Sequence, residues 1–580
     1  MELLSQFVNV VNNVLRWPLV IGLLGAGLFL TIRLGFIQFR RLGHGFAVAT
    51  GRYDDPDEPG DVSHFQALTT ALSATVGVGN IAGVAYAIHI GGPGALFWMW
   101  ITALLGMATK YSEVTLAQHY REVHHDEDGK AWEGSVSGGP MYYIERGLGK
   151  AWKPVAAFFA FALMLTSFMT GNAVQANTVA VQVADSFGIA TWVTGLVTAA
   201  IVGVVILGGI SRIGKVTSVV APVMAAVYVL GALVILALNV GDIPAAFATI
   251  VTEAFNPRAG VAGTGVGVLL TTMLFGVQRG LFSNEAGQGS APIAHSAAKT
   301  DEPVSEGAVA LLEPFIDTII ICTMTGLVLV TTGAYSATTP TEFSLTGANV
   351  SFVEGSREAG FSPYAGADPL VFKEGVPQVL DGPRVGRFDV GIDTLFVDRA
   401  QTVPFEGTID PSARAAVGAD GETVPTLYGN TVRNSAPLTT LAFELGLGQI
   451  GLAGLGRGIV LFSVILFAIS TSISWSYYGD RCANYLFGPK AILPFKAVFV
   501  VMHFVGAVLA ITTIWDLGDV ALSLVTLPNV LALVLLSGTL KKLTDSYFER
   551  APWVENAEVH KRVVAEKEAQ RAAKRRPPQS

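Results

Sequence analysis

The sequence predicts an all-α polytopic membrane protein with eleven transmembrane helices and a small extracellular insertion that contains β-strands. Two observations carry this prediction, the composition and the number of long apolar stretches. Of the 580 residues, 51% are hydrophobic and only 14% are charged, whereas a typical soluble domain carries about 25% charged residues. So few charges cannot cover a soluble protein of this length, which excludes an ordinary soluble enzyme. The net charge of −8 also argues against a nucleic-acid partner.

Eleven stretches are apolar and reach the length of about 20 residues that a helix needs to cross the hydrocarbon core. In chain order they are 18–37, 65–90, 94–115, 152–172, 192–209, 216–240, 266–298, 307–332, 458–478, 497–515 and 520–537. If the N-terminus lies outside, 25 of the 37 lysine and arginine residues fall on the inner side. Because positive charge concentrates in cytoplasmic loops, we expect the N-terminus outside and the C-terminus in the cytoplasm.

One long segment, residues 335–456, breaks this pattern because it is polar and rich in Gly, Pro and Asp. Its stretch 388–397, FDVGIDTLFV, alternates in a way that favours short strands. Long segments are translocated regardless of their charge, so the topology is unaffected. We expect an extracellular insertion here, whose role is open between an elaborated loop, structural shielding and partner binding.

The second stretch contains Gly77, Val78, Gly79 and Asn80 near its middle. Each glycine lowers helix stability by about 1 kcal/mol relative to alanine. Unwound backbone within a membrane is tolerated only where it is buried in protein or lines a cavity. A break here frees carbonyl and N–H groups that can bind an ion or a small polar ligand.

The seventh stretch is also rich in glycine and carries Arg279, Asn284 and Glu285. A charged pair at membrane depth is costly, so we expect Arg279 and Glu285 to form an internal latch, to contact substrate or ion, or to do both. Close packing of small residues is an alternative reason for the glycines. It does not explain the asparagines beside them.

Four further stretches follow each of these two, which defines two blocks of five with opposite orientation. Interrupted helices at matching positions of two inverted halves indicate the binding site of a secondary transporter. The expected division is 1–64 (N-terminal helix and cytoplasmic loop), 65–240 (first repeat), 241–334 (start of the second repeat), 335–456 (insertion), 457–540 (rest of the second repeat) and 541–580 (cytoplasmic tail).

The ninth stretch contains FAISTSISW, in which Ala468, Thr471 and Ser472 share one helix face. Two hydroxyls and a loosened carbonyl offer hard oxygen ligands that suit Na⁺. The alternative is that these hydroxyls bond back to carbonyls of their own helix.

Four long strings resemble the alanine or glycine:cation symporter family. They are TVGVGNIAGVA (75–85), GGPGALFWMWITALLG (91–106), SGGPMYYIERGLG (137–149) and GLFSNEAGQGSAPIAHSAA (280–298). The resemblance covers the membrane part and excludes the 335–456 insertion. It implies a leucine-transporter-type fold, with a five-plus-five inverted repeat after one extra N-terminal helix. It also implies Na⁺-coupled uptake of small neutral amino acids, alanine or glycine, in a prokaryotic plasma membrane, with no cofactor besides Na⁺ as coupling ion.

The resemblance also implies site residues. The sodium site would use the carbonyls of Ser73, Val76 and Ala468 and the hydroxyls of Thr471 and Ser472. The substrate carboxylate would meet the N–H groups of Val78, Gly79 and Asn80, and its ammonium group would meet carbonyls at a break around Phe275–Gln278. The other candidate substrate contacts are Thr75, Gly77, Thr170, Gly171, Asn172, Met273, Phe275, Gly276, Gln278, Phe282, Ser283 and Asn284. Met273, Phe275 and Phe282 would restrict the substrate side chain to the size of a methyl group.

Three other functions remain open at this point. A transporter coupled to H⁺ would use the intramembrane carboxylates Glu285, Glu313 and Asp317. A channel or an amino-acid sensor would use the insertion as its receptor. An intramembrane enzyme is disfavoured, because the sequence has no HExxH, GxSxG or paired-Asp motif.

Overall fold

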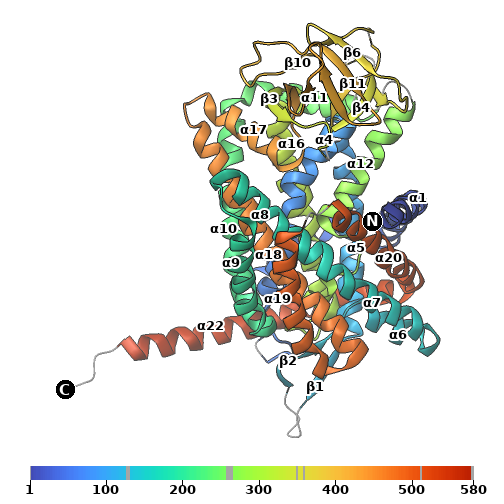
Figure 1. The fold of residues 1–580 in the computed structure, drawn as a ribbon. Helices are drawn as coiled ribbons and strands as arrows, with labels where there is room; N and C mark the ends of the chain where they lie inside the picture. The colour runs from blue at the N-terminus through green and yellow to red at the C-terminus, as the bar shows by residue number, and fades with distance from the viewer. Residues whose placement is uncertain are drawn as a thin grey trace.

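The computed structural model describes the chain except for residues 1, 56, 126–130, 257–265, 348–349, 357–359, 380, 389, 510–511 and 576–580. A long helical body carries a β-rich module at one end, and the C-terminal helix projects from the opposite end (Figure 1).

The helices of the first half are α1 Glu2–Arg33, α2 Ile37–Ala49, α3 His64–Thr75, α4 Val84–Gly91, α5 Ala95–His119, α6 Pro140–Leu148, α7 Lys153–Phe168, α8 Val174–Phe187, α9 Thr191–Ile206, α10 Gly209–Leu238 and α11 Ile243–Glu253. Those of the second half are α12 Val266–Asn284, α13 Ala291–His295, α14 Pro303–Ala310, α15 Leu312–Pro314, α16 Thr323–Thr331, α17 Ser435–Gly448, α18 Ala453–Phe487, α19 Ile492–Val508, α20 Thr512–Leu535, α21 Ser537–Arg550 and α22 Trp553–Arg575. Three segments are π-helical, η1 Gly79–Gly83, η3 Met169–Ala173 and η5 Phe315–Cys322. Four are 3₁₀-helical, η2 Lys150–Trp152, η4 Val240–Asp242, η6 Ala334–Ser336 and η7 Pro489–Ala491.

Among the described residues, five helices are long and apolar enough to cross a membrane, and up to eight if each of three bent pairs forms one span. The chain is therefore a mostly helical, polytopic membrane protein, as expected. The helices α5, α9 and α12 lie on the other three expected stretches. They do not meet the same standard of length and apolar composition, and α9 has only 16 residues.

The second stretch is interrupted where its glycines predict. Helices α3 and α4 are bent by 49°, and the π-helical turn η1 begins at Gly79. The first stretch is bent more sharply, by 79° between α1 and α2. Gly35 and Phe36 form that turn with φ values of +62° and +58°, a left-handed conformation that glycine adopts readily.

The seventh stretch is interrupted at a different place from the one expected. Helix α12 runs without a break to Asn284, and the irregular backbone follows at residues 285–290. The prediction of unwound backbone around Phe275–Gln278 is therefore wrong. The fourth stretch also runs further than residue 172, because the π-helical turn η3 lets the helix continue as α8.

The segment 335–456 holds the β-rich module, which confirms the strand prediction. Its strands are β3 Thr338–Phe343, β4 Val350–Ser356, β5 Gly360–Pro363, β6 Leu370–Lys373, β7 Val376–Pro377, β8 Arg384–Arg387, β9 Val390–Gly391, β10 Leu395–Phe396, β11 Gly407–Asp410, β12 Ala415–Gly418, β13 Thr423–Val424 and β14 Leu427–Val432. They form three antiparallel sheets, ordered β10-β14-β3, β13-β12-β11-β6-β7 and β5-β4-β8-β9. A separate hairpin, β1 Glu122–His125 with β2 Ala131–Ser137, lies near the opposite end of the body (Figure 1).

The same segment ends in a helix that the sequence analysis did not anticipate. Helix α17 is largely buried, and its Thr439 hydroxyl donates to the carbonyl oxygen of Ile81 at 2.9 Å. The acceptor lies in η1, next to the break between α3 and α4. The chain therefore returns from the β-rich module into direct contact with the interrupted helix.

Small residues let α12 approach α5 closely. A Cβ atom built on Gly276 would lie 2.4 Å from the carbonyl oxygen of Ala95, and one built on Gly280 would lie 3.2 Å from the Cα atom of Met99. Packing of small residues is therefore the role of these two glycines in this structure.

We expect Gly276→Ala to destabilise the protein by about 1–3 kcal/mol, because the added methyl group cannot fit against a backbone oxygen. Thermal unfolding in detergent measures this loss. Gly454→Ala is the matched control, since nothing lies within 4 Å of a Cβ atom built there. Equal melting temperatures for the two variants would contradict the packing role.

Candidate ion and substrate site

Three π-helical turns occur in the described part of the chain, two of them in stretches to which the sequence assigns site residues. They are η1 in the second stretch, η3 in the fourth and η5 in the eighth. A π-helical turn inserts one residue into an α-helix and leaves carbonyl groups without their usual partners, so such turns often mark functional sites. The sequence predicted the interruption at η1 and named candidate residues in η3. It did not predict η5.

Asn80 lies at the centre of this region and is fully buried. Its side-chain oxygen accepts the N–H of Gly77 at 2.8 Å, which closes the turn at the break. Its amide nitrogen donates to Asp317 Oδ1 at 2.6 Å and to Ser283 Oγ at 3.1 Å. Its main-chain oxygen accepts the hydroxyl of Thr325 at 2.9 Å. One side chain thus joins the broken helix to α12 and η5.

Asp317 is the partner that the sequence analysis did not assign to this site. It is fully buried, and besides Asn80 its carboxylate accepts the hydroxyls of Ser283 and Thr318, each at 2.7 Å. The amide of Asn284 donates to Thr318 Oγ1 at 3.2 Å. In the sequence, Asp317 stands out as a lone aspartate in the apolar run FIDTIIIC. The sequence analysis names it only as a carboxylate that could exchange protons.

The predicted ion ligands of the second and ninth stretches meet. Thr471 Oγ1 on α18 donates to the carbonyl oxygen of Ser73 at 3.0 Å. A hydroxyl that donates one hydrogen bond keeps two lone pairs, which are available to a cation. The hydroxyls of Ser73 and Ser472 are buried and have no hydrogen-bond partner among the described residues. Unpaired buried hydroxyls beside a carbonyl fit a small cation that prefers oxygen ligands.

Val76 and Ala468, the other two predicted ligands, are 2% and 1% exposed and belong to one apolar cluster. Gly77 adjoins the site closely, because a Cβ atom built on it would lie 2.8 Å from Thr471 Oγ1. Any side chain at position 77 would therefore displace the threonine hydroxyl.

The other predicted residues are divided between the site and ordinary packing. Gly171 lies against Trp475, because a Cβ atom built on it would be 2.5 Å from the Trp475 ring. The Thr170 hydroxyl is buried without a hydrogen-bond partner in the described part of the chain. Asn172 instead bonds His503 and the carbonyl of Phe499 on α19, both at 2.7 Å.

Four further residues that were expected to contact the substrate lie in different surroundings. Met273 packs on the cluster that α12 shares with α1 and α20, and the Thr75 hydroxyl bonds back to the Ala71 carbonyl at 3.2 Å. Tyr86 and Phe282 lie around Arg279, and Phe275 packs against Tyr86 with ring centroids 6.0 Å apart. The guanidinium carbon of Arg279 is 4.5 Å from the Tyr86 ring centre and 5.4 Å from that of Phe282.

The latch between Arg279 and Glu285 is not formed, so that prediction is wrong. Glu285 accepts the indole N–H of Trp475 at 3.2 Å and a short hydrogen bond from Ser290. None of the ion pairs between described residues joins Glu285 to Arg279. The guanidinium of Arg279 is stabilised by aromatic rings instead.

A chain of buried charges, here called the ionic chain, runs from α5 to the start of α3. It consists of Lys110, Glu313, His295, Glu306 and His64, which are all at most 3% exposed. Lys110 pairs with Glu313 at 3.2 Å, and His295 bridges Glu313 at 2.9 Å and Glu306 at 2.5 Å. Glu306 makes a short hydrogen bond to His64 Nδ1. The five residues link the second, third, seventh and eighth stretches at one end of the helical body.

Comparison with known proteins shows the family of the chain. Residues 1–361 and 421–561 match the sodium:alanine symporter family. The chain belongs to this family. Membership confirms the resemblance seen in the sequence, and it confirms that the protein is a transporter and not an enzyme. The unmatched residues 362–420 lie within the β-rich module.

Two curated relatives and one solved structure are similar to this symporter-family member. The sodium/alanine symporter AgcS of Methanococcus maripaludis is 38% identical over 547 residues, which cover 94% of this chain and 97% of the relative. The putative sodium/proton-dependent alanine carrier protein YrbD of Bacillus subtilis is 31% identical over 540 residues, 92% of this chain and 90% of the relative. The crystal structure of MhsT in complex with L-phenylalanine aligns with a TM-score of 0.49 and 12% identity, over 82% of this chain and 89% of that chain.

We expect Thr471→Val to raise the Na⁺ concentration for half-maximal transport by roughly tenfold or more, because a ligand to a charged group is lost. Na⁺ activation curves measured in proteoliposomes test this expectation. Thr331→Val is the matched control, since that hydroxyl bonds only to the Leu327 carbonyl of its own helix among the described contacts. An unchanged curve for Thr471→Val would remove this residue from the ion site.

Proposed function

We propose that the protein is a secondary active transporter that couples Na⁺ entry to the uptake of small neutral amino acids, chiefly alanine, with glycine as the alternative. The observation that carries this proposal is the contact of Thr471 with the Ser73 carbonyl, which joins α18 to the broken helix beside two unpaired hydroxyls. The names of two relatives, a sodium/alanine symporter and a putative sodium/proton-dependent alanine carrier, support it.

The proposed architecture has eleven spans, with one peripheral helix and loop (1–64) before a leucine-transporter-type repeat of five plus five helices. The first repeat is 65–240, and the second consists of 241–334 and 457–540. The β-rich module and α17 make up most of the extracellular segment 335–456, and 541–580 forms a cytoplasmic tail. Relatives from bacteria and an archaeon support a place in a prokaryotic plasma membrane. The excess of lysine and arginine on one side of the expected spans is the argument for an N-terminus outside.

In the proposed ion site, Na⁺ lies among the carbonyls of Ser73, Val76 and Ala468 and the hydroxyls of Thr471 and Ser472. These ligands are neutral, so the ion keeps its full charge. A charge in a low-dielectric interior attracts a substrate carboxylate at the neighbouring break. Binding of either ligand then raises the affinity for the other by the same factor.

In the proposed substrate site, the carboxylate meets the N–H groups of Val78 and Gly79 at the start of the second half-helix. The N–H of Asn80, also expected to bind it, donates instead to the Gly77 carbonyl at 3.2 Å. The positive end of a helix dipole favours an anion there. A Cβ atom built on Gly79 would lie 3.8 Å from the Cα atom of Ser283. The two helices therefore approach closely beside Gly79, so that only a small substrate could be accommodated between them.

Transport follows by alternating access around this site. Four spans form a bundle that rocks against the rest of the protein. They are α3–α4, α5, α12–α13 and α14–α16. The ionic chain has members on all four spans, so they move as one body. Na⁺ bridges this bundle to α18, and loss of Na⁺ at its low cytoplasmic concentration releases the bridge and then the substrate.

Coupling to H⁺ is the second candidate, and Asp317 favours it. Its carboxylate lies beside the break and receives hydrogen bonds from Asn80, Ser283 and Thr318. Replacement of Na⁺ by choline at fixed pH separates the two candidates. We expect alanine uptake by proteoliposomes to fall to background, and full retention of uptake would refute Na⁺ coupling.

We expect Gly79→Leu to abolish alanine uptake, because the side chain would fill the space for the carboxylate. Gly79→Ala is the matched control, since a single methyl group makes only an ordinary contact with Ser283. Radiolabelled alanine uptake by both variants, at equal amounts of inserted protein, measures the difference. Normal uptake by Gly79→Leu would place the carboxylate elsewhere.

A further inference from the structure

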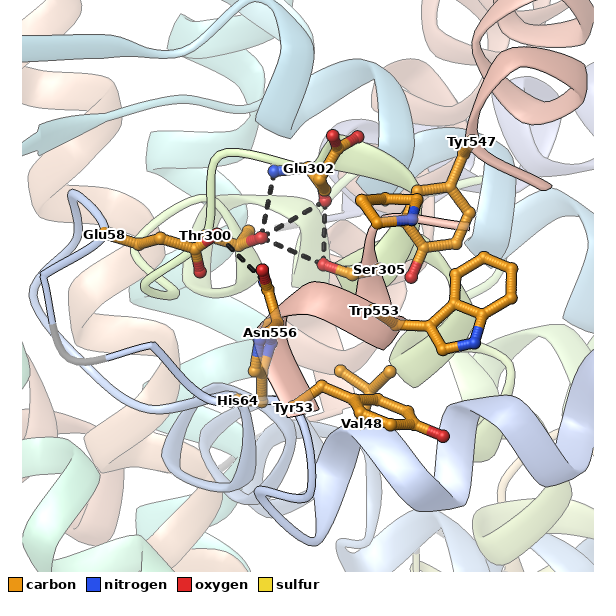
Figure 2. Close-up of a pocket in the computed structure, with 11 residues that line it drawn as sticks. Val48, Tyr53, Glu58, His64, Thr300, Glu302, Ser305, Tyr547, Trp553 and Asn556 are labelled. Carbon is orange, nitrogen blue, oxygen red and sulfur yellow. Dashed lines mark hydrogen bonds between the residues drawn. The ribbon is translucent and has the colours of Figure 1, made fainter. Parts of the chain in front are cut away.

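A pocket opens on the end of the body that carries α22, opposite the β-rich module. Tyr53, Glu58 and His64 line it together with the start of α14 and the start of α22 (Figure 2). Asn556 of α22 donates to Glu58 at 3.3 Å (Figure 2), and His560 bonds the carbonyl of Asp54 at 3.3 Å. The loop before α3 and the C-terminal helix therefore cover the pocket together.

The ionic chain ends in this pocket. His64 Nδ1 bonds Glu306, while its Nε2 atom lies 4.0 Å from Asp54 Oδ1, beyond hydrogen-bond distance. The next member inward, His295, touches a carboxylate oxygen with each ring nitrogen. A neutral imidazole has only one N–H donor, so the unit of His295 with Glu306 and Glu313 must hold an additional proton. His64 is thus the member that faces both a proton-holding unit and the pocket.

The groups around His64 are mostly acidic. The charged and titratable side chains that face it or line its pocket are Tyr53, Asp54, Glu58, Arg121, His295, Asp301, Glu302, Glu306, Tyr547 and His560. Two of these are already held by other partners. Arg121 donates to the carbonyls of Pro59, Ser296, Ala298 and Thr300, and Glu302 pairs with Arg550 at 2.7 Å. The remaining acids favour the uptake of a proton.

We propose that His64 and the acids of this pocket form a proton-binding site on the C-terminal face, and that a bound proton holds this face shut. A proton on His64 Nε2 would attract Asp54 and strengthen the bond of Nδ1 to Glu306, since charged hydrogen bonds are stronger. The contact with Asp54 ties the start of α3 to the covering loop, and the bond to Glu306 ties it to α14. A bundle held in this way opens more slowly toward the cytoplasm, so acid on this side slows substrate release.

Glu58, which lies outside the membrane spans, acts in the same direction. Burial, with Asp301 nearby, raises the pKa of Glu58 to about 7, and burial raises the pKa of Asp54 as well. A carboxyl group whose pKa is raised in the covered pocket stabilises that arrangement when it is protonated, below its raised pKa. The stabilisation is lost as the pH rises through about 7 for Glu58. Acid therefore favours the covered pocket at Glu58, whereas Asp54 must stay ionised to attract the proton on His64.

The inference rests on the proposed transport function, and uptake measurements test it first. Vesicles with the C-terminal face inside are held at constant external pH and Na⁺ gradient while the internal pH is varied. For one proton, we expect the initial rate of alanine uptake to fall by about tenfold between roughly pH 8 and pH 6. We expect His64→Gln to flatten this dependence. The matched control is His119→Gln, an exposed histidine near the same face, which should keep it.

A second measurement needs no transport. Val48 lines the pocket and is 1% exposed, and both native cysteines are buried. In detergent, the rate at which Val48→Cys reacts with a polar thiol reagent, relative to the exposed reference Ser546→Cys, should fall as the pH is lowered. We expect the fall to disappear when His64→Gln is added.

These results separate the two proposals. Reactivity that follows pH in protein that shows no Na⁺-driven uptake would support the proton site and refute the transport function. The proton site would be overturned if the rate of uptake did not depend on internal pH. It would also be overturned if the pH dependence were unchanged in His64→Gln in both measurements.

Discussion

Within a bilayer, every backbone N–H and C=O group that leaves a regular helix must find a partner inside the protein. The break between α3 and α4 depends on this constraint. The Asn80 side chain accepts the Gly77 N–H, while hydroxyls of Thr325 and Thr439 are donated to the carbonyls of Asn80 and Ile81. The donors come from α16 and α17, so the interrupted helix exists only because distant parts of the chain complete it. The proposed ion and substrate sites lie beside groups that remain available after these bonds are made.

Buried charge obeys the same rule and organises the other end of the body. Lys110, Glu113, Glu306 and Glu313 are fully buried, and a single unpaired charge in that environment would cost several kcal/mol. Each one is met by a partner on another helix, as when Glu113 receives the Gly289 N–H at 2.9 Å and the Asn529 amide at 2.5 Å. Pairing of this kind fixes which helices stay together while others move, so the electrostatics of the interior define the rigid parts of the transporter.

Particular residues show how much of the fold and of the candidate site could be predicted from the sequence. The glycines and asparagine at 77–80 and the hydroxyl face of α18 were recognisable, because their chemistry is local and unusual in an apolar stretch. The second break was misplaced, because Gly276 and Gly280 serve close packing against α5. The true irregular segment has left-handed φ values at Glu285, Gly287 and Gly289, and it is held by Glu113 and Asn529 from far along the chain. The role of Asp317 depends on a π-helical turn, whose register no local pattern reveals.

The β-rich module joins the helical body through one pair of strands. β3 and β14 run antiparallel from Thr338 opposite Val432 to Phe343 opposite Leu427, and the family match stops at 361 and resumes at 421. The strands by which the chain enters and leaves the β-rich module, both inside the family match, are therefore clamped side by side. A loop whose ends are already fixed can lengthen at small entropic cost. In evolution this position can thus serve as an insertion port, where segments at this end of the helical body are gained, lost or exchanged without disturbing the helices.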